Sequence, residues 1–131
     1  MAQIGHKGEI LFEYFAADQD WEVSKPFGNS DKYDYVVNDK EKLFTVQVKT
    51  CKSKKAGSPT DVYEVISCKY KRGKKENYEK GDFDYFAFVI LEEKVLYLIP
   101  AKLAIKRSSV MLYPHRPEKD KKWGKYLKKI F

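Results

Sequence analysis

Two β-rich segments joined by a short polar turn constrain the fold of this chain more than any other feature. Residues Tyr33–Val37 and Leu43–Thr50 are rich in β-branched and aromatic side chains, which are typical of strands. The residues between them, Asn38–Lys42, are polar and have the length of a hairpin turn. We therefore expect the two segments to pair as antiparallel strands of one sheet.

The second of these strands carries polar side chains on one face. Because successive side chains of a strand point to opposite faces, Gln47 and Lys49 share a face, whereas Val46 and Val48 project into a core on the other side. Asp34 lies at the start of the first strand, at the open end of the hairpin, where residues of the two strands face each other. The hairpin therefore predicts that Asp34, Gln47 and Lys49 converge.

A helix is expected ahead of this hairpin. Apolar residues recur at helical spacing between Gly5 and Asp18 and form one apolar face. Glu9 and Glu13 lie four residues apart and therefore share a helix face. Spacing alone leaves open which of the two carboxylates joins the polar residues of the hairpin.

The converging side chains have the chemistry of a divalent-metal site that acts on phosphodiesters. Magnesium takes oxygen ligands, and hydrolysis of a phosphodiester needs a cation that polarises the phosphoryl oxygen and lowers the pKa of the attacking water. The expected ligands are the Asp34 carboxylate, the Gln47 side-chain oxygen and the Val48 carbonyl, with Glu9 acting through a bound water or on a second metal. Lys49 is expected to position the water or to stabilise charge on the phosphate. The expected cofactor is Mg2+, with Mn2+ able to substitute.

These residues belong to a longer series of short motifs in a fixed order. The pieces are Gly8-Glu9, Tyr33-Asp34-Tyr35, Gln47-Val48-Lys49-Thr50, Asp84-Tyr85-Phe86-Ala87 and Tyr97-Leu98-Ile99-Pro100. In these motifs the chain resembles the PD-(D/E)XK nuclease superfamily, in which a helix-borne Glu, a strand-borne Asp and an acidic-X-Lys tripeptide surround one or two magnesium ions. It is similar to the group I intron homing endonucleases of that superfamily and, more distantly, to archaeal Holliday junction resolvases.

The resemblance implies a fold and a set of site residues. The fold is α/β, a restriction-endonuclease-like core with a central mixed β-sheet flanked by helices, and the catalytic residues are Glu9, Asp34, Gln47 and Lys49. Glu9 is favoured over Glu13 because the resolvases place their Glu at about the same distance before the Asp. Gln47 stands where the resolvases usually have an acidic residue, and a neutral Gln is expected to bind the metal less tightly than a Glu.

The remaining segments predict a single nuclease domain over residues 1–131. Further strands are expected at Trp21–Ser24, Asp61–Lys69, Phe83–Leu91 and Val95–Ile99, a short helix at Ala101–Lys106, and a last helix at Glu118–Ile130. The loop Lys25–Asp31 contains Gly and Asn and allows a close approach to a ligand.

The formal net charge is +7, and much of the positive charge lies in blocks. The first block contains Lys52, Lys54 and Lys55, and the second contains Lys69, Lys71, Arg72, Lys74 and Lys75. Such runs are either a solvated surface or a binding surface for the phosphate backbone of DNA, and the position of the first block just after Lys49 favours phosphate contact. The second block is expected to be a mobile loop that orders on DNA and positions it without specifying its sequence.

Cysteine usage and hydropathy predict an intracellular protein. Cys51 and Cys68 lack CxxC spacing and His partners, so reduced thiols are expected and a zinc site is not. No apolar stretch has the length of a signal sequence or a membrane span, so we expect a cytoplasmic, DNA-associated protein with no membrane partner.

We therefore predict a magnesium-dependent DNA endonuclease of the homing or another site-specific type. Two alternatives stay open: a Holliday junction resolvase that recognises branched DNA, and a DNA-binding module of the same fold that has lost its metal through Gln47. A chain with one active site must pair with a copy to cut both strands of double-stranded DNA, so we also predict a homo-oligomer, either a dimer or a tetramer.

Overall fold

The structure, a computed structural model, describes residues 4–28, 32–57 and 61–131. In chain order its elements are helix α1 (Ile4–Asp18), strands β1 (Glu22–Ser24), β2 (Tyr35–Asn38), β3 (Leu43–Cys51), β4 (Tyr63–Ile66), β5 (Lys69–Lys71), β6 (Lys74–Glu76), β7 (Tyr85–Ile90) and β8 (Val95–Pro100), the 3-10 turn η1 (Ala101–Leu103), β9 (Ser109–Leu112), the 3-10 turns η2 (Pro117–Lys119) and η3 (Gly124–Tyr126), and β10 (Leu127–Lys129).

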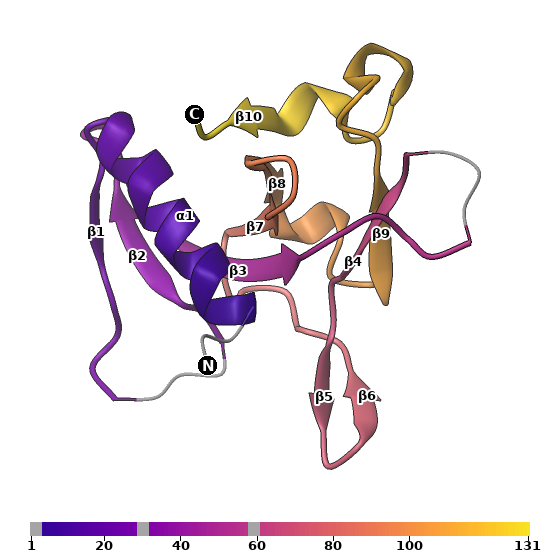
Figure 1. The fold of residues 1–131 in the computed structure, drawn as a ribbon. Helices are drawn as coiled ribbons and strands as arrows, with labels where there is room; N and C mark the ends of the chain where they lie inside the picture. Colours follow the sequence, from indigo (N-terminus) through magenta and orange to yellow (C-terminus); the bar gives the residue numbers. More distant parts are fainter. Residues whose placement is uncertain (1–3, 29–31, 58–60) are drawn as a thin grey trace.

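A six-stranded mixed sheet forms the centre of the molecule, with the strand order β1-β2-β3-β7-β8-β10 (Figure 1). Its neighbouring strands are antiparallel apart from β3 and β7, which run parallel. The predicted hairpin is confirmed as β2 and β3, with Tyr35 opposite Val46. The second predicted hairpin is confirmed as β7 and β8. The Asp84 carboxylate accepts hydrogen bonds from the backbone N–H of Thr45 at 2.9 Å and from its hydroxyl at 3.3 Å, which ties the start of β7 to β3.

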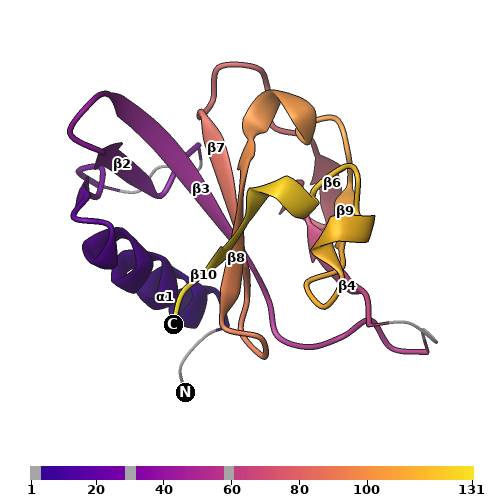
Figure 2. The same cartoon turned by 90° about the horizontal axis from the view of Figure 1, so that it is seen from above.

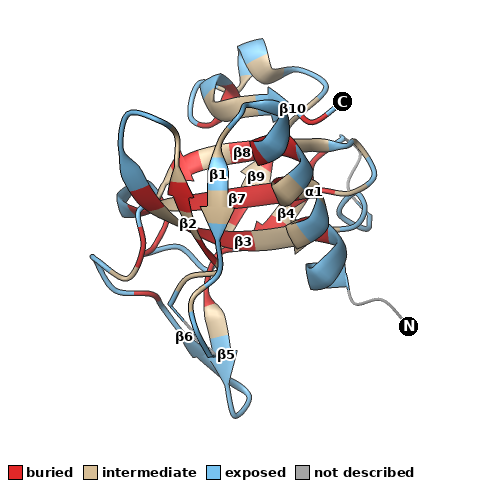
Figure 3. Ribbon diagram, turned by 90° about the vertical axis from the view of Figure 1, so that its left-hand side faces the viewer, coloured by how far each residue is buried: buried red, intermediate tan, exposed pale blue. Residues whose placement is uncertain are grey.

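The sheet is covered on both faces, as Figure 2 shows. On one face α1 packs Phe12 and Phe15 against a cluster that contains Val46 and Val48, the inward side chains of β3. On the other face a separate cluster contains Phe86 and Phe88 of β7, and it is covered by the β4–β9 ribbon and by the turns that follow β8 and β9. Figure 3 shows the resulting buried central strands. The predicted mixed sheet is confirmed, with α1 on one face and a ribbon in place of helices on the other.

The prediction of a last helix at Glu118–Ile130 is wrong. This segment forms the turns η2 and η3 and then β10, which pairs with β8 and places Leu127 opposite Tyr97. Gly124 lies so close to the backbone of Pro117 that a Cβ atom would be 1.9 Å from the carbonyl oxygen. Glycine is also a poor helix former, so the chain gains more by adding an edge strand than by forming a helix.

The prediction of one strand over Asp61–Lys69 and of a loop after it is also wrong. The strand ends at Ile66, where the Ser67 N–H donates to the Ser108 carbonyl, and a new strand begins at Lys69. The second basic block is then a regular antiparallel hairpin, β5–β6, rather than a loop.

Among the described residues no helix has the length and apolar character needed to cross a membrane. Cys51 and Cys68 are both free thiols. The predicted ligand-approach loop lies only partly in the described chain, because residues 29–31 fall outside it.

Candidate active site

Asp34 is held at the point where β2 begins to pair with β3. Its backbone N–H donates to the carbonyl of Val46 at 2.8 Å. Its side-chain Oδ2 accepts hydrogen bonds from the Val48 N–H at 2.8 Å and from Gln47 Nε2 at 2.9 Å. The predicted convergence of Asp34 with Gln47 is therefore confirmed by direct contact.

The surroundings of the Asp34 carboxylate change its pKa. Burial raises the pKa of this carboxyl, while the hydrogen bond from Val48 and the positive charges of Lys49 and Lys25 act in the opposite direction. Because burial is the largest of these effects, the ionised form of Asp34 is disfavoured relative to an exposed aspartate. A positive ion bound at this carboxylate would remove that penalty.

The Val48 backbone faces the same edge as Asp34. A strand residue presents its N–H and its C=O along one edge, and the Val48 N–H points to Asp34. The Val48 carbonyl therefore lies on the side of β3 that β2 leaves unpaired, since the β2–β3 register ends at Tyr35 and Val46. This places the carbonyl beside Asp34, as a ligand role for Val48 requires.

Lys49 lies on the face of the sheet opposite α1 and reaches the root of the β5–β6 hairpin. Its Nζ donates to the carbonyl of Cys68 at 3.1 Å and lies 5.0 Å from the centroid of the Tyr78 ring. Burial lowers the pKa of the Lys49 ammonium, and the charge of Asp34 partly offsets this effect. Lys49 is thus electrostatically coupled to Asp34 while its ammonium rests on a backbone carbonyl.

Glu9 reaches the site from α1. The helix approaches β3 closely because Gly8 packs directly on Thr50, where a Cβ would be 1.9 Å from Thr50 Oγ1. Burial raises the pKa of Glu9, and the nearby charge of Asp34 raises it further. The Glu9 carboxylate lies 3.9 Å from the Lys25 ammonium.

Glu13, the other helix carboxylate, has a different partner. The Tyr35 hydroxyl donates to Glu13 Oε2, and this bond together with burial raises the pKa of Tyr35. Glu13 also lies 3.8 Å from the Lys25 ammonium. Glu13 is therefore held by Tyr35, whereas the charge of Asp34 acts on Glu9, which favours Glu9 as the helix carboxylate of the site.

The oxygen donors of Asp34, its β3 neighbours and Glu9 are of the kind that a hard divalent cation takes. They are two carboxylates, a backbone carbonyl and an amide side chain, which are oxygen donors of the kind magnesium prefers. Glu9 and Asp34 both have pKa values raised by burial, and Asp34 raises that of Glu9, so a cation between them would favour both anionic forms. In the part of the chain that the structure describes, no group of three or more His, Cys, Asp or Glu side chains gathers. A cation here would therefore keep several waters or bind substrate oxygens.

Lys25 is a site residue that sequence reasoning missed. It follows β1, and the pairing of Ser24 with Val36 brings it next to the Tyr35 ring, with its ammonium 5.6 Å from the ring centroid. From there it contacts both helix carboxylates, and its positive charge offsets part of the rise in the pKa of Glu9 and Asp34. No local motif marks it, because its position depends on the β1–β2 register. Tyr78, which packs beside Lys49, was missed for the same reason.

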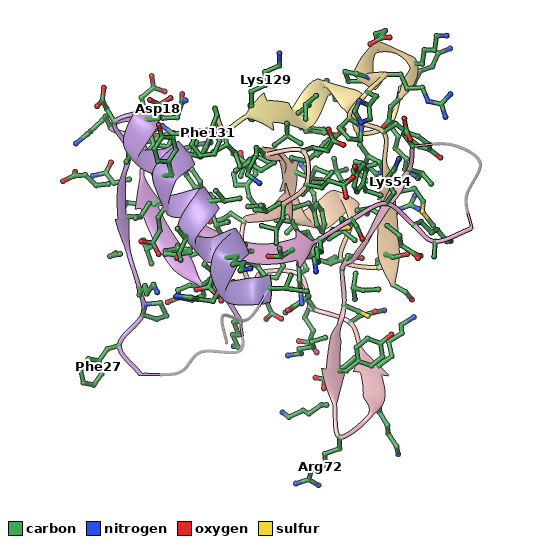
Figure 4. All side chains as sticks on the ribbon, viewed as in Figure 1. Asp18, Phe27, Lys54, Arg72, Lys129 and Phe131 are labelled. Carbon is green, nitrogen blue, oxygen red and sulfur yellow. The ribbon has the colours of Figure 1, made fainter. Side chains whose placement is uncertain are left out.

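The basic blocks lie in different places and have different partners. In the first block Lys54 pairs with Asp61 at 3.1 Å and Lys55 with Glu64 at 3.6 Å. In the second block Lys69 pairs with Glu76 at 3.7 Å. Figure 4 shows Lys54 beside the main body and Arg72 at the far end of the projecting hairpin. The two blocks therefore do not form one continuous surface, and most of the first block is locally neutralised.

Comparisons with known proteins identify a family and similar solved structures. A model of a family described as PD-(D/E)XK endonuclease matches residues 2–128. A solved structure described as a bacterial homing endonuclease, I-Ssp6803I, is 25% identical with a TM-score of 0.70, and the match covers 83% of this chain and 75% of that one. The structure of MepB is 17% identical over 93% of this chain and 95% of that one, with a TM-score of 0.47. None of the curated proteins compared matches the sequence.

Proposed function

The chain belongs to the PD-(D/E)XK endonuclease family, and we propose that it hydrolyses phosphodiester bonds of DNA with Mg2+ at the site formed by Glu9, Asp34, Gln47 and Lys49. The observation that carries the proposal is the anchoring of the Asp34 carboxylate on β3 by the Val48 N–H and the Gln47 amide. The charge of this carboxylate also acts on the pKa of Glu9 and of Lys49. Such a grouping of perturbed acids and a half-buried lysine is typical of a functional site.

The metal-binding residues in this proposal are Asp34, Glu9, the Val48 carbonyl and the Gln47 side chain. When bound, Mg2+ supplies a Lewis acid that polarises the phosphoryl oxygen and lowers the pKa of water. Asp34 is pre-positioned for its role, because the Val48 N–H and the Gln47 amide fix one carboxylate oxygen. Mn2+ is expected to substitute.

Lys49 supplies positive charge to the phosphate. Its ammonium is partly desolvated, which strengthens its electrostatic interaction with an anionic group that builds up charge. It reaches the phosphate by exchanging its hydrogen bond with the Cys68 carbonyl for one with a phosphoryl oxygen. The exchange replaces a neutral acceptor by a charged one and is therefore favourable.

Gln47 tunes the site in this proposal. Its amide donates to Asp34 Oδ2, a contact that a Glu at this position makes only when it is protonated. The amide thereby steadies the Asp34 carboxylate without adding a negative charge. The cost is one fewer anionic ligand, so the affinity for the metal is expected to be modest.

The substrate is proposed to be double-stranded DNA cut at specific sites. The similarity to a homing endonuclease supports this type of cleavage over resolution of four-way junctions. The DNA-binding residues in this proposal are Lys52, Lys54, Lys55, Lys69, Lys71, Arg72, Lys74 and Lys75. Lys54 and Lys55 would have to exchange their carboxylate partners for phosphates. To cut both strands the protein would act as a dimer or tetramer.

The test uses purified protein with supercoiled plasmid, linear duplexes and synthetic four-way junctions, each with Mg2+ and with a chelator. Metal-dependent cleavage of duplex DNA at defined positions is the expected result. Cleavage confined to junctions would favour a resolvase. DNA binding without cleavage under any metal condition would contradict the enzyme and leave a DNA-binding module of the same fold.

A further inference from the structure

The β5–β6 hairpin projects from the body of the protein as a two-stranded arm (Figures 1 and 3). Within the described residues its strands pair with each other alone, in a sheet of their own. Residues 70–76 are all exposed, so the arm adds nothing to either core. A lone two-stranded hairpin is marginally stable in water, and these residues are therefore not explained by their contribution to folding.

The charges near the end of the arm are arranged unfavourably for the protein by itself. At its root, Lys69 lies opposite Glu76 and forms an ion pair with it at 3.7 Å. Closer to the tip, Lys71 lies directly opposite Lys74. Like charges at directly opposite positions of an antiparallel pair are destabilising. An anionic partner such as a phosphate would turn this repulsion into binding.

The tip itself carries an arginine where the turn favours other residues. Arg72 has φ 54° and Gly73 has φ 77°, so both central residues are left-handed, as in a type I′ turn. Asn, Asp and Gly are preferred at the first of these positions, and a longer side chain there costs conformational energy. The chain thus places a guanidinium at the outermost point of the arm (Figure 4), although this residue makes the turn less stable.

The shape of the arm fits a groove of duplex DNA. The major groove admits a two-stranded β-ribbon, and Arg forms a bidentate pair with O6 and N7 of guanine. The root of the arm is fixed beside the proposed active site, because Lys49 binds the Cys68 carbonyl and the Tyr78 ring lies 5.0 Å from the Lys49 ammonium and 5.3 Å from that of Lys69. From Lys69 to Arg72 the arm extends about 10 Å, at roughly 3.3 Å per residue. At about 3.4 Å per base step, the tip reaches bases within about three base pairs of the phosphate.

We propose that the arm enters the major groove next to the scissile phosphate, that Arg72 reads a guanine there, and that Lys71 and Lys74 hold the flanking phosphates. This inference rests on the proposed nuclease function and adds to it the residue that determines specificity. It replaces the expectation of a loop that only positions DNA, because the paired strands β5 and β6 present the tip residue in a defined turn.

The test measures base preference with a library of random-sequence duplexes. Wild-type protein, Arg72→Asn and the double variant Lys71→Ala/Lys74→Ala are each incubated with the library in chelator, and bound duplexes are recovered and sequenced. The same library is then digested in Mg2+ and the new ends are sequenced. Arg72→Asn suits the type I′ turn, so it is expected to fold at least as well as the wild type. Lys94→Asn is the matched control, because Lys94 is also a basic residue with positive φ (55°) in a turn away from the arm.

The wild type is expected to enrich guanine at one position near the cut, and Arg72→Asn to lose that preference by roughly tenfold or more. The double lysine variant should bind all sequences more weakly with the same preference, and Lys94→Asn should match the wild type. Equal profiles for Arg72→Asn and the wild type, or no enrichment by the wild type, would overturn the inference. Arg72-dependent enrichment without any cleavage would instead refute the nuclease function and leave the arm's role intact.

Discussion

Individual residues of the site are placed for chemistry at a cost to stability. Asp34 and Glu9 are carboxylates whose burial disfavours their ionised forms, and Asp34 adds to the penalty on Glu9. The positive charge of Lys25, which lies 3.9 Å from Glu9, offsets part of this penalty at both Glu9 and Asp34. A site of this kind is poised to gain stability when a cation binds.

The first prediction concerns Asp34→Asn. The raised pKa of Asp34 means that its contribution to stability is fully present below the ordinary aspartate pKa and is lost as pH rises through the raised value. Asp34→Asn should therefore melt at a higher temperature than the wild type near neutral pH without metal, and the difference should shrink as the pH is lowered. Melting temperatures over a pH series measure this directly.

Asp39→Asn provides the matched control. Hydrogen bonds from the N–H groups of Lys42 and Glu41 hold the pKa of Asp39 below its usual value, so this carboxylate stabilises the fold at neutral pH and loses that effect as pH falls through the lowered pKa. Asp39→Asn should therefore melt lower than the wild type. An Asp34→Asn variant that also melts lower at neutral pH would show that the Asp34 carboxylate is not strained.

Gln47 allows a second prediction at this scale. Gln47→Glu removes the amide that donates to Asp34 Oδ2 at 2.9 Å and places a second acid there, so the metal-free protein should be less stable. The added anionic ligand should lower the Mg2+ concentration needed for half-maximal cleavage, whereas Gln47→Ala should raise it. Magnesium titrations of the three proteins test this, and identical midpoints would exclude Gln47 as a ligand.

At the scale of elements, the sequence predicted the parts of the fold with strong periodicity. The β2–β3 hairpin and the β7–β8 hairpin are continuous β-rich runs with short turns, and they were placed correctly. The last helix was mispredicted because Trp123, Leu127 and Ile130 have helical spacing, while their packing is set by pairing with β8 and by the contact of Gly124 with Pro117. The β5–β6 hairpin was missed because its turn is Arg72-Gly73 rather than Asn-Gly.

The site likewise contains residues that could be predicted from the sequence and residues that could not. Asp34 and Gln47 could be predicted because one hairpin brings them together. The hydrogen bond from Lys49 to Cys68 and the place of Lys25 could not, because they depend on where separate elements pack. Glu9 could be predicted in part. Its motif includes Gly8, whose contact with Thr50 sets the distance of α1 from β3, but the packing of α1 on the sheet also decides its position.

A third prediction concerns that helix contact. Gly8→Ala places a methyl 1.9 Å from Thr50 Oγ1, so α1 must shift and carry Glu9 with it. We expect a loss of about 1–3 kcal/mol in the free energy of unfolding, together with reduced cleavage. Gly5→Ala on the same helix meets nothing within 4 Å and should be neutral or stabilising by about 0.5–1 kcal/mol. Equal stabilities of the two variants in denaturant titrations would contradict the close approach.

In the molecule as a whole the net charge is +7, and its lysines differ in whether a carboxylate neutralises them. Lys54 and Lys55 are paired with carboxylates, whereas Lys71 and Lys74 repel each other across the arm. The arm extends away from the sheet while its root contacts Lys49, so the exposed charge begins beside the site and leads outward. This arrangement favours a duplex that crosses the site and lies along the arm.

The fourth prediction follows from this distribution. The logarithm of DNA affinity should fall linearly with the logarithm of salt concentration, by about 0.9 for each duplex phosphate neutralised. Lys71→Ala/Lys74→Ala should flatten the slope by roughly two units, and Lys54→Ala/Lys55→Ala by less, because those lysines already have acidic partners. Filter binding over a salt series measures both slopes. A larger change in the second variant would place the DNA on the first block instead.

The most direct test of the account is cleavage by Asp34→Ala and Lys49→Ala, measured in Mg2+ alongside DNA binding in chelator. Asp34 is placed to hold the metal and Lys49 to contact the phosphate, and neither belongs to the apolar core. The account predicts that both variants lose cleavage while they keep the fold and most of the affinity for DNA. Cleavage at the wild-type rate by either variant would contradict the proposed site.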